Sequence, residues 1–388
     1  MSGRPFLQIP GPTLVPDRVV RAMAQPIIDH RGPRFEALVR ECLDGLKTVF
    51  KTERGHVVLY PGSGTGAWEA TIVNTLSPGD RVLACVNGHF ATGFARTAAA
   101  FGAEVERIEL PYGAGVSADT IEERLRADQA HEISAVLVVH NETSTGVTSD
   151  VAAIRRAIER ARHPALLLVD TVSSLASIDF RMDEWGVDVA LTGPQKGLML
   201  PPGMAILAVG ERALRASEKA RCPRSFWDWR PVIERNRQGQ YPYTPATSLL
   251  FGLRESLTML REEGLDDVFA RHARLAEACR RAVRAWPLPL LCQNPAEYSN
   301  TLTAVVMPPG IDSDDFVQRA YRRLELSLGV GLGEVKGKVF RIGHLGSVNE
   351  MDLLGGLAGT EMMLRDVGVS LALGSGLAAA QEYLVSAS

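Results

Sequence analysis

Short apolar runs alternate with amphipathic segments through the middle of the chain. Each run has the length of one buried strand, and the segments between runs place apolar residues three and four positions apart with charges between them. This alternation is typical of βαβ units, so we predict an α/β fold with a mostly parallel central sheet flanked by helices. The predicted strands cover residues 56–60, 81–86, 104–110, 134–140, 165–170, 187–192 and 203–209.

The pattern changes in the last third of the chain. A long helix is predicted over residues 248–286, and the proline-rich stretch "WPLPLL" ends it. Shorter predicted strands and helices follow, as in a second, smaller α/β unit. We therefore divide the chain into an N-terminal segment (1–15), a large domain (16–263) and a small C-terminal domain (264–388), with the boundary inside the long helix.

Composition narrows the class of protein. The net charge of −3 and the 22% of charged residues do not indicate a nucleic-acid partner. The five cysteines are widely spaced and contain no CxxC pair, which argues against a disulfide framework or a zinc site. Neither a signal-peptide core nor a run of about 20 apolar residues is visible, so we expect a cytoplasmic protein with small-molecule partners and no membrane contact.

The first predicted strand ends in a loop of small residues, "PGSGTG", that opens a helix. Free N–H groups and the positive end of the helix dipole suit a phosphate, which Ser63, Gly64 and Thr65 would line. The alternative is a glycine-rich turn in which Ser63 or Thr65 caps the helix. No Gly-Lys-Ser/Thr follows, so the loop is not a Walker A motif, and the next strand lacks the acidic end of a dinucleotide site.

Further polar and aromatic residues follow the next strands, where parallel sheets gather their ligands. Phe90 is either a core residue or an aromatic plate for a flat ligand, and residues 140–145 form an unusually polar cluster. Asp170 ends a very apolar run, either as a helix cap or as the partner of a cationic ring nitrogen. Lys196 follows the predicted strand 187–192, either as an ordinary surface lysine or as a partly desolvated amine that acts as a Schiff-base nucleophile. A phosphate loop, a plate, a carboxylate and an amine together are what pyridoxal 5′-phosphate requires.

The chain resembles the class V (fold type I) aminotransferases, and within them the serine–glyoxylate and alanine–glyoxylate family with its aspartate–glyoxylate relatives. The likeness rests on "IPGPTLVP", "TIVNTLSPGDRVLACVNGHF", "HNETSTGV", "LLVDTVSSLASIDFRMDEWGVDVALTGPQKGLMLPPG", "YPYTPATSLLFGL" and "VFRIGHLG", which together span nearly the whole chain. The resemblance implies a fold type I transferase in which the large domain binds the cofactor.

The resemblance also assigns roles around the cofactor ring. Lys196 matches the lysine that forms the internal aldimine, and Asp170 matches the carboxylate that pairs with the pyridine nitrogen. Phe90 stands where the animal alanine–glyoxylate enzymes typically stack a tryptophan on the ring, and Thr143 matches a hydroxyl residue near the ring oxygen. Arg341 matches the arginine that holds the substrate α-carboxylate.

A further group of residues matches the phosphate site of that family. Tyr241 and Thr244 match residues that reach the phosphate from the neighbouring subunit, which implies a homodimer. The residues of the same chain that match the phosphate cup are Ser63, Gly64, Thr65 and Gln195.

The implied activity is transfer of an amino group from a small L-amino acid to glyoxylate by a ping-pong Schiff-base mechanism, giving glycine and a 2-oxo acid. Serine is the first candidate donor, with aspartate and alanine as alternatives; Arg31, Tyr241, Tyr243 and the "PGPT" segment are candidates for donor selection. A lyase of the cysteine desulfurase type is less favoured, because Phe90 replaces the histidine that such enzymes typically place over the ring. A non-catalytic nucleotide-binding protein would leave Lys196, Asp170 and Arg341 without a shared purpose.

Overall fold

The structure is a computed structural model that describes residues 6–387. Its large sheet has seven strands in the order β2-β10-β9-β8-β5-β3-β4, and all of them are parallel except β10, which is antiparallel to both β2 and β9. The predicted strands and the mostly parallel sheet are thus confirmed. The strands are β2 (His56–Pro61), β3 (Arg81–Val86), β4 (Glu104–Glu109), β5 (Ile133–Val139), β8 (Leu166–Asp170), β9 (Val189–Thr192) and β10 (Met204–Val209).

Helices flank this sheet, and their buried faces follow from the sequence pattern. In the helix over Val151–Arg160 (α6), the buried residues Val151, Ile154 and Ile158 lie three and four positions apart, so one apolar stripe faces the sheet. The other helices of this part are α1 (Asp17–Met23), α2 (Pro33–Phe50), α3 (Gly64–Thr75), α4 (His89–Ala100), α5 (Ala118–Ala127), α7 (Glu211–Ser217), α8 (Trp229–Asn236) and α9 (Thr247–Glu263).

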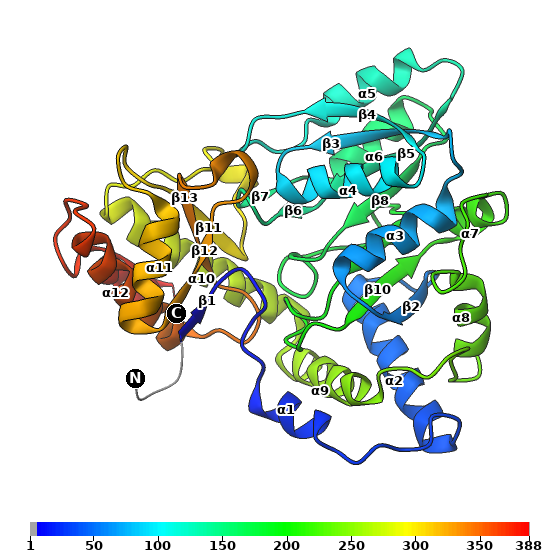
Figure 1. Cartoon of the computed structure of the whole chain (residues 1–388), viewed down its shortest axis with the longest axis horizontal. Coiled ribbons are helices and arrows are strands. Elements are labelled where there is room, and N and C mark those ends of the chain that lie inside the picture. The colour runs from blue at the N-terminus through cyan, green and yellow to red at the C-terminus, as the bar shows by residue number, and fades with distance from the viewer. Residues whose placement is uncertain (1–5, 388) are drawn as a thin grey trace.

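A second sheet of four strands, in the order β1-β12-β13-β11, lies beside the large one (Figure 1). It has its own hydrophobic core, which includes Trp286, Phe316 and Phe340. The first strand of the chain belongs to this sheet, although the rest of the sheet lies some 300 residues later. Its elements are β1 (Phe6–Gln8), α10 (Leu265–Ala285), β11 (Leu302–Val306), α11 (Ser313–Leu324), β12 (Leu326–Val330), β13 (Val339–Gly343), α12 (Glu350–Asp366) and α13 (Ser375–Ser386).

The prediction of one helix over residues 248–286 is wrong. Two helices, α9 and α10, occupy this stretch, and Gly264 separates them with a φ of 87°. The backbone N–H of Gly264 donates to the carbonyl of Leu260 at 3.0 Å, so this glycine ends α9 in a conformation that other residues rarely adopt. The break lies at the predicted domain boundary, which itself stays a prediction.

Short elements complete the described chain. The hairpin of β6 and β7 follows β5, and two short 3₁₀ helices lie in the small unit. Among the helices of residues 6–387, none combines the length and the apolar character needed to cross a bilayer. The short elements are β6 (Asn141–Glu142), β7 (Val147–Thr148), η1 (Pro295–Glu297) and η2 (Gly333–Val335).

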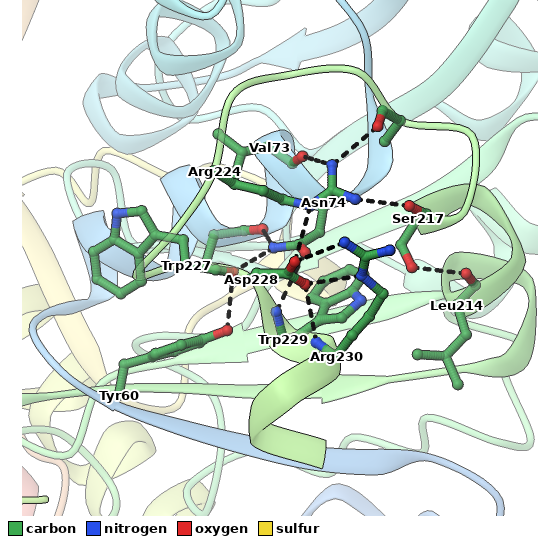
Figure 2. Close-up of polar contacts among 12 residues, drawn as sticks. Tyr60, Val73, Asn74, Leu214, Ser217, Arg224, Trp227, Asp228, Trp229 and Arg230 are labelled. Atoms are coloured by element: carbon green, nitrogen blue, oxygen red, sulfur yellow. Dashed lines mark hydrogen bonds and ion pairs between the residues drawn. The ribbon is translucent and has the colours of Figure 1, made fainter. Parts of the chain in front are cut away.

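The segment between α7 and α8 is fastened to α3, as Figure 2 shows. Asn74, a fully buried residue of α3, donates to the carbonyl of Trp227 at 2.6 Å and accepts the backbone N–H of Trp229 at 3.3 Å. The hydroxyl of Tyr60 donates to the same Trp227 carbonyl at 2.9 Å, and Arg224 donates to the last turn of α3. These bonds fix the backbone at Trp227, and the indole N–H of Trp227 donates to the carboxylate of Glu69 on α3 at 3.2 Å.

Trp227 in turn packs on the loop that joins β2 to α3. A Cβ atom placed on Gly66 would lie 2.7 Å from the indole ring of Trp227, and one placed on Gly62 would lie 3.2 Å from it. The absence of side chains at these two positions therefore allows the indole to contact the loop backbone directly.

We expect Asn74→Ala to lower the free energy of unfolding by about 1–3 kcal/mol, because it leaves a buried backbone N–H without its acceptor. Thr75→Ala is the matched control, since the Thr75 hydroxyl donates to Thr71 inside the same helix, and we expect it to cost less than about 1 kcal/mol. Urea unfolding of both variants measures the difference. Equal costs would contradict a fastening role for Asn74.

Candidate active site

The predicted site residues gather at the carboxyl ends of the parallel strands. Asp170 is the last residue of β8 and pairs in register with Leu191 of β9, and Lys196 follows β9 by a few residues. Both side chains are buried: Asp170 is 3% exposed and Lys196 is 8% exposed. The sheet therefore brings an acid and an amine into one region from which water is largely excluded.

Asp170 is held by neutral donors. The indole N–H of Trp68, on α3, donates to one carboxylate oxygen at 2.7 Å, and the backbone N–H of Val172 donates to the other at 2.7 Å. Burial raises the pKa of Asp170 to about 6, while these two hydrogen bonds and the charge of Lys196 oppose the rise. A buried carboxylate with neutral partners is suited to bind a cationic group of a ligand.

Lys196 is the complementary group. Its Nζ donates to the carbonyl of Pro10, in the segment that follows β1. Burial lowers the pKa of Lys196 to about 8; the positive charge of Arg341 adds to this shift and the negative charge of Asp170 opposes it. The neutral, nucleophilic amine is therefore accessible close to neutral pH, which an exposed lysine would not allow.

Arg341 reaches this region from the small sheet. It lies on β13, where its Nε donates to the carbonyl of Val330 at 2.9 Å and its Nη1 donates to the carbonyl of Thr143 at 2.7 Å. Burial lowers the pKa of Arg341 to about 10, and the charge of Glu142 opposes the shift. Within residues 6–387 the guanidinium is held by carbonyl groups and no carboxylate forms an ion pair with it.

Glu142 and Thr143 organise the loop after β5. The carboxylate of Glu142, which is fully buried, accepts the backbone N–H groups of Ala91 and Ser144, both at 2.9 Å. Its position at the first turn of α4 complements the helix dipole and fixes the helix that carries Phe90. Phe90 is half-buried, and Thr143 is buried with its hydroxyl donating to Ser173 at 2.7 Å.

The loop between β2 and α3 has the geometry of a small anion site. Ser63 is the N-cap of α3, and its hydroxyl accepts the backbone N–H of Gly66 at 3.2 Å, so the capping interpretation of this serine is confirmed. Ser63 and Thr65 are nevertheless exposed, and they lie at the positive end of α3. The side-chain oxygen of Gln195, next to Lys196, is buried and has no hydrogen-bond partner within residues 6–387. The loop thus offers donors to an anion.

Within residues 6–387, no hydrogen bond joins Tyr241, Thr244 or Arg31 to these groups. The ring of Tyr241 packs edge-on against Phe35 of its own chain, with the centroids 6.3 Å apart. Its hydroxyl is buried without a hydrogen-bond partner in the described part of the chain, so it would have to turn outward to reach a second subunit. Thr244 is exposed before α9, and Arg31 is exposed between α1 and α2.

The sequence did not identify several residues that shape the site. No sequence pattern indicates a role for Trp68, and Glu142 stands out only as one member of a polar cluster. Trp227 was also missed, although the aromatic-rich "SFWDW" is a compositional signal. The contact of Pro10 with Lys196 joins residues 186 positions apart, a distance that no local pattern spans.

Comparisons with known proteins agree with this geometry. The family described as aminotransferase class-V matches residues 6–330. The chain is 50% identical over 383 residues to the L-aspartate–glyoxylate aminotransferase of Paracoccus denitrificans, covering 99% of this chain and 97% of that protein. It is 48% identical over 383 residues to the serine–glyoxylate aminotransferase of Arabidopsis thaliana, covering 98% and 96%. The solved structure of ureidoglycine–glyoxylate aminotransferase from Bacillus subtilis superposes with a TM-score of 0.91 at 26% identity, covering 99% of each chain.

The raised pKa of Asp170 predicts a pH-dependent stability when no ligand is bound. Because the folded state holds this proton more tightly than the unfolded state, the stabilising contribution is present below about pH 4 and is lost as the pH rises through about 6. Asp170→Asn cannot ionise and escapes this loss. Between pH 4 and 7 we expect the free energy of unfolding of Asp170→Asn to rise by about 2 kcal/mol relative to that of the wild type.

Urea unfolding of the ligand-free proteins at several pH values measures this gain. Trp68→Phe is the companion variant: it removes a hydrogen bond that favours the ionised carboxylate, so its loss of stability with rising pH should exceed that of the wild type. Parallel curves for wild type and Asp170→Asn would show that Asp170 titrates as an ordinary carboxylate.

Proposed function

The chain belongs to the class-V aminotransferase family, and we propose that it transfers an amino group from a small L-amino acid to glyoxylate with pyridoxal 5′-phosphate as its cofactor. The observation that carries this proposal is the buried set of Lys196, Asp170 and Arg341 at the carboxyl edge of the large sheet. Two similar proteins whose names include glyoxylate, each matching almost the whole chain, support the choice of acceptor.

The residues present fit this cofactor. Asp170 is a buried carboxylate without a cationic hydrogen-bond partner in the described residues, as a protonated ring nitrogen requires. Ser63, Thr65 and the amides that open α3 suit the phosphate, to which Gln195, next to Lys196, would donate through its side-chain NH2 group. Phe90, at the start of α4, is the aromatic residue for one face of the ring.

Each residue then has a separate task. When bound, the cofactor supplies an aldehyde that bonds to amines and a ring that acts as an electron sink. Lys196, as a neutral amine, would take the proton from the substrate α-carbon and deliver it to the carbon that the aldehyde of the cofactor supplies. Asp170 would keep a proton on the ring nitrogen, and Arg341 would hold the substrate α-carboxylate. Because Nε and Nη1 of Arg341 already donate to the carbonyls of Val330 and Thr143, the donor offered to the substrate would be its other terminal nitrogen, Nη2.

Serine is the proposed donor, and aspartate and alanine are the alternatives. All three share the α-amine and α-carboxylate, so Lys196 and Arg341 do not distinguish them. Aspartate would require a second cation for its side chain. Arg341 is the arginine whose charge acts on Lys196, and it is already assigned to the α-carboxylate. Arg31, the candidate for a second carboxylate, is exposed on the loop between α1 and α2. This arrangement favours serine and alanine, which have only one carboxylate.

A lyase of the cysteine desulfurase type has less support. Such an enzyme requires an accessible, reactive thiol, and every cysteine of this chain is buried: Cys42, Cys85, Cys222, Cys279 and Cys292. Burial raises the pKa of the Cys85 thiol to about 12, so it is not a nucleophile.

A homodimer and a cytoplasmic location complete the proposal. Thr244 is exposed and free to contact a second subunit, and the buried hydroxyl of Tyr241 would gain an acceptor by turning toward a neighbouring phosphate. The five unpaired cysteines suit a reducing compartment.

The reaction is tested by titrating the purified, cofactor-loaded enzyme with L-serine, L-alanine and L-aspartate in turn, and then with glyoxylate. We expect serine to convert the cofactor absorbance to that of pyridoxamine 5′-phosphate, and glyoxylate to restore it. Lys196→Ala should do neither at a measurable rate. If only aspartate or only alanine changed the cofactor absorbance, that amino acid would be the donor instead of serine. If glyoxylate failed to restore the absorbance, the proposal that glyoxylate is the acceptor would be wrong.

The lowered pKa of Lys196 predicts how cofactor capture depends on pH. Because only the neutral amine attacks, the rate at which cofactor-free enzyme bonds to pyridoxal 5′-phosphate should rise with pH and level off near 8. Arg341→Met removes a positive charge that disfavours the protonated amine, so the levelling point should move to higher pH. Stopped-flow absorbance measures both profiles. A wild-type capture rate that continued to rise beyond pH 10 would show that the pKa of Lys196 is not lowered by burial.

A further inference from the structure

The segment Phe6–Thr13 connects the small sheet with the loop that carries Lys196. Its first residues form β1, which pairs with β12 in parallel, and Gln8 donates to the carbonyl of Gly343 at 2.6 Å. Its last residue, Thr13, donates through its backbone N–H to the carbonyl of Gln195 at 3.1 Å and through its hydroxyl to the carbonyl of Lys196 at 3.2 Å. The segment is thus fastened at both ends.

Between these two attachments, Pro10 and Gly11 lie directly on the Lys196 side chain. The Nζ of Lys196 donates to the carbonyl of Pro10. Gly11 has a φ of 93°, and a Cβ atom at this position would lie 2.6 Å from Nζ and 2.4 Å from Cδ of the lysine. Gly11 therefore satisfies two requirements at once, a left-handed backbone and contact with the lysine without a side chain between them.

The same segment also lies against β13, the strand that carries Arg341, and against its neighbour β12. A Cβ atom on Gly329, the residue paired with Arg341, would lie 2.9 Å from Cδ of Pro10. A Cβ atom on Gly343 would lie 2.2 Å from the carbonyl oxygen of Ile9. The backbone of residues 9–11 is therefore packed between the strand of the arginine and the amine of the lysine, with no space for an added side chain on either side.

We propose that Pro10 and Gly11 are positioning residues for Lys196: the Pro10 carbonyl holds the ε-amine whenever it is not bonded to the cofactor, and Gly11 keeps the space that the amine needs. The proposal rests on the proposed function, in which the amine is released and bonded again in every cycle. A neutral amine that donates one N–H to a fixed carbonyl loses rotational freedom, and its lone pair stays free to accept the substrate proton.

The first test compares Gly11→Ala with Gly79→Ala in the cofactor-loaded enzyme. Both glycines have similar positive φ values, 93° and 89°, but no atom lies within 4 Å of a Cβ at Gly79. Both variants therefore carry the backbone strain, and only Gly11→Ala displaces the lysine. We expect Gly11→Ala to lower kcat by about 100-fold with a much smaller change in the donor KM, since misplacement of a reacting group acts on the chemical step. Gly79→Ala should keep the wild-type kcat.

Equal kcat values for the two variants would overturn the proposal. A large rise in KM without a fall in kcat would also overturn it, because the segment would then act on substrate binding instead of on the lysine.

The second test does not depend on turnover or on correct folding of the Gly11 variant. Full-length wild-type enzyme is loaded either with pyridoxal 5′-phosphate, which bonds to Lys196, or with pyridoxamine 5′-phosphate, which leaves the amine free. Hydrogen–deuterium exchange of the peptide that contains Gly11 and Thr13 is then measured by mass spectrometry. We expect exchange to be about fivefold slower with pyridoxamine 5′-phosphate, because the Pro10 carbonyl then has its donor.

Lys196→Met is the control for this comparison, since its side chain has a similar length and no N–H to donate. The two cofactor forms should then exchange at the same rate. Equal rates in the wild type would overturn the proposal and leave the aminotransferase assignment intact, whereas a failure to form the lysine-bonded form at all would count against the proposed function itself.

Discussion

The site depends on the burial of an acid and an amine side by side at the carboxyl edge of a parallel sheet. Removing water acts on the two groups in complementary directions: it raises the pKa of Asp170 to about 6 and lowers that of Lys196 to about 8. Their mutual attraction opposes both shifts. The amine of Lys196 is therefore easily deprotonated, and the carboxylate of Asp170 has only neutral hydrogen-bond donors around it in the described residues. Both pKa shifts come from one cause, the exclusion of solvent around the ends of β8 and β9.

The charged groups of the site are held by neutral dipoles instead of ion pairs. Asp170 accepts from an indole and a backbone N–H, and Arg341 donates to two backbone carbonyls. Asp188, near β9, shows the contrast: it is also buried, but Arg212 contacts its carboxylate at 3.1 Å. An ion pair of that kind would neutralise Asp170, which would then not suit the cationic ring that we propose it binds. The hydrogen-bond partner thus distinguishes Asp188, which is paired with an arginine, from Asp170, which could bind a cationic ligand.

Local patterns in the sequence predicted the strands and some of the site residues, but not the contacts that depend on packing. Uninterrupted apolar runs predicted the strands of the large sheet, and the rule that ligands gather at strand ends directed attention to Asp170 and Lys196. The break at Gly264 was missed because the helical spacing continues on both sides of the glycine. Trp68 and Pro10 could not be found, since their contacts with Asp170 and Lys196 depend on how α3 and the first strand pack, and local periodicity contains no information on that packing.

Arg341 could be assigned only by resemblance, because it lies on the small sheet, whereas Lys196 follows a strand of the large sheet. Its approach to Lys196 is set by two connections between the sheets: the hydrogen bond from Arg341 to the carbonyl of Thr143, and the segment that runs from β1 to Thr13. Because β1 is part of the small sheet and Thr13 is bonded to the lysine loop, a shift of the small sheet would move Pro10 relative to the ε-amine. The backbone of residues 9–11 therefore links the strands around Arg341 to the loop of Lys196. The separation of these two side chains, which we propose hold the substrate carboxylate and move its proton, is thus a property of the fold and not of either side chain alone.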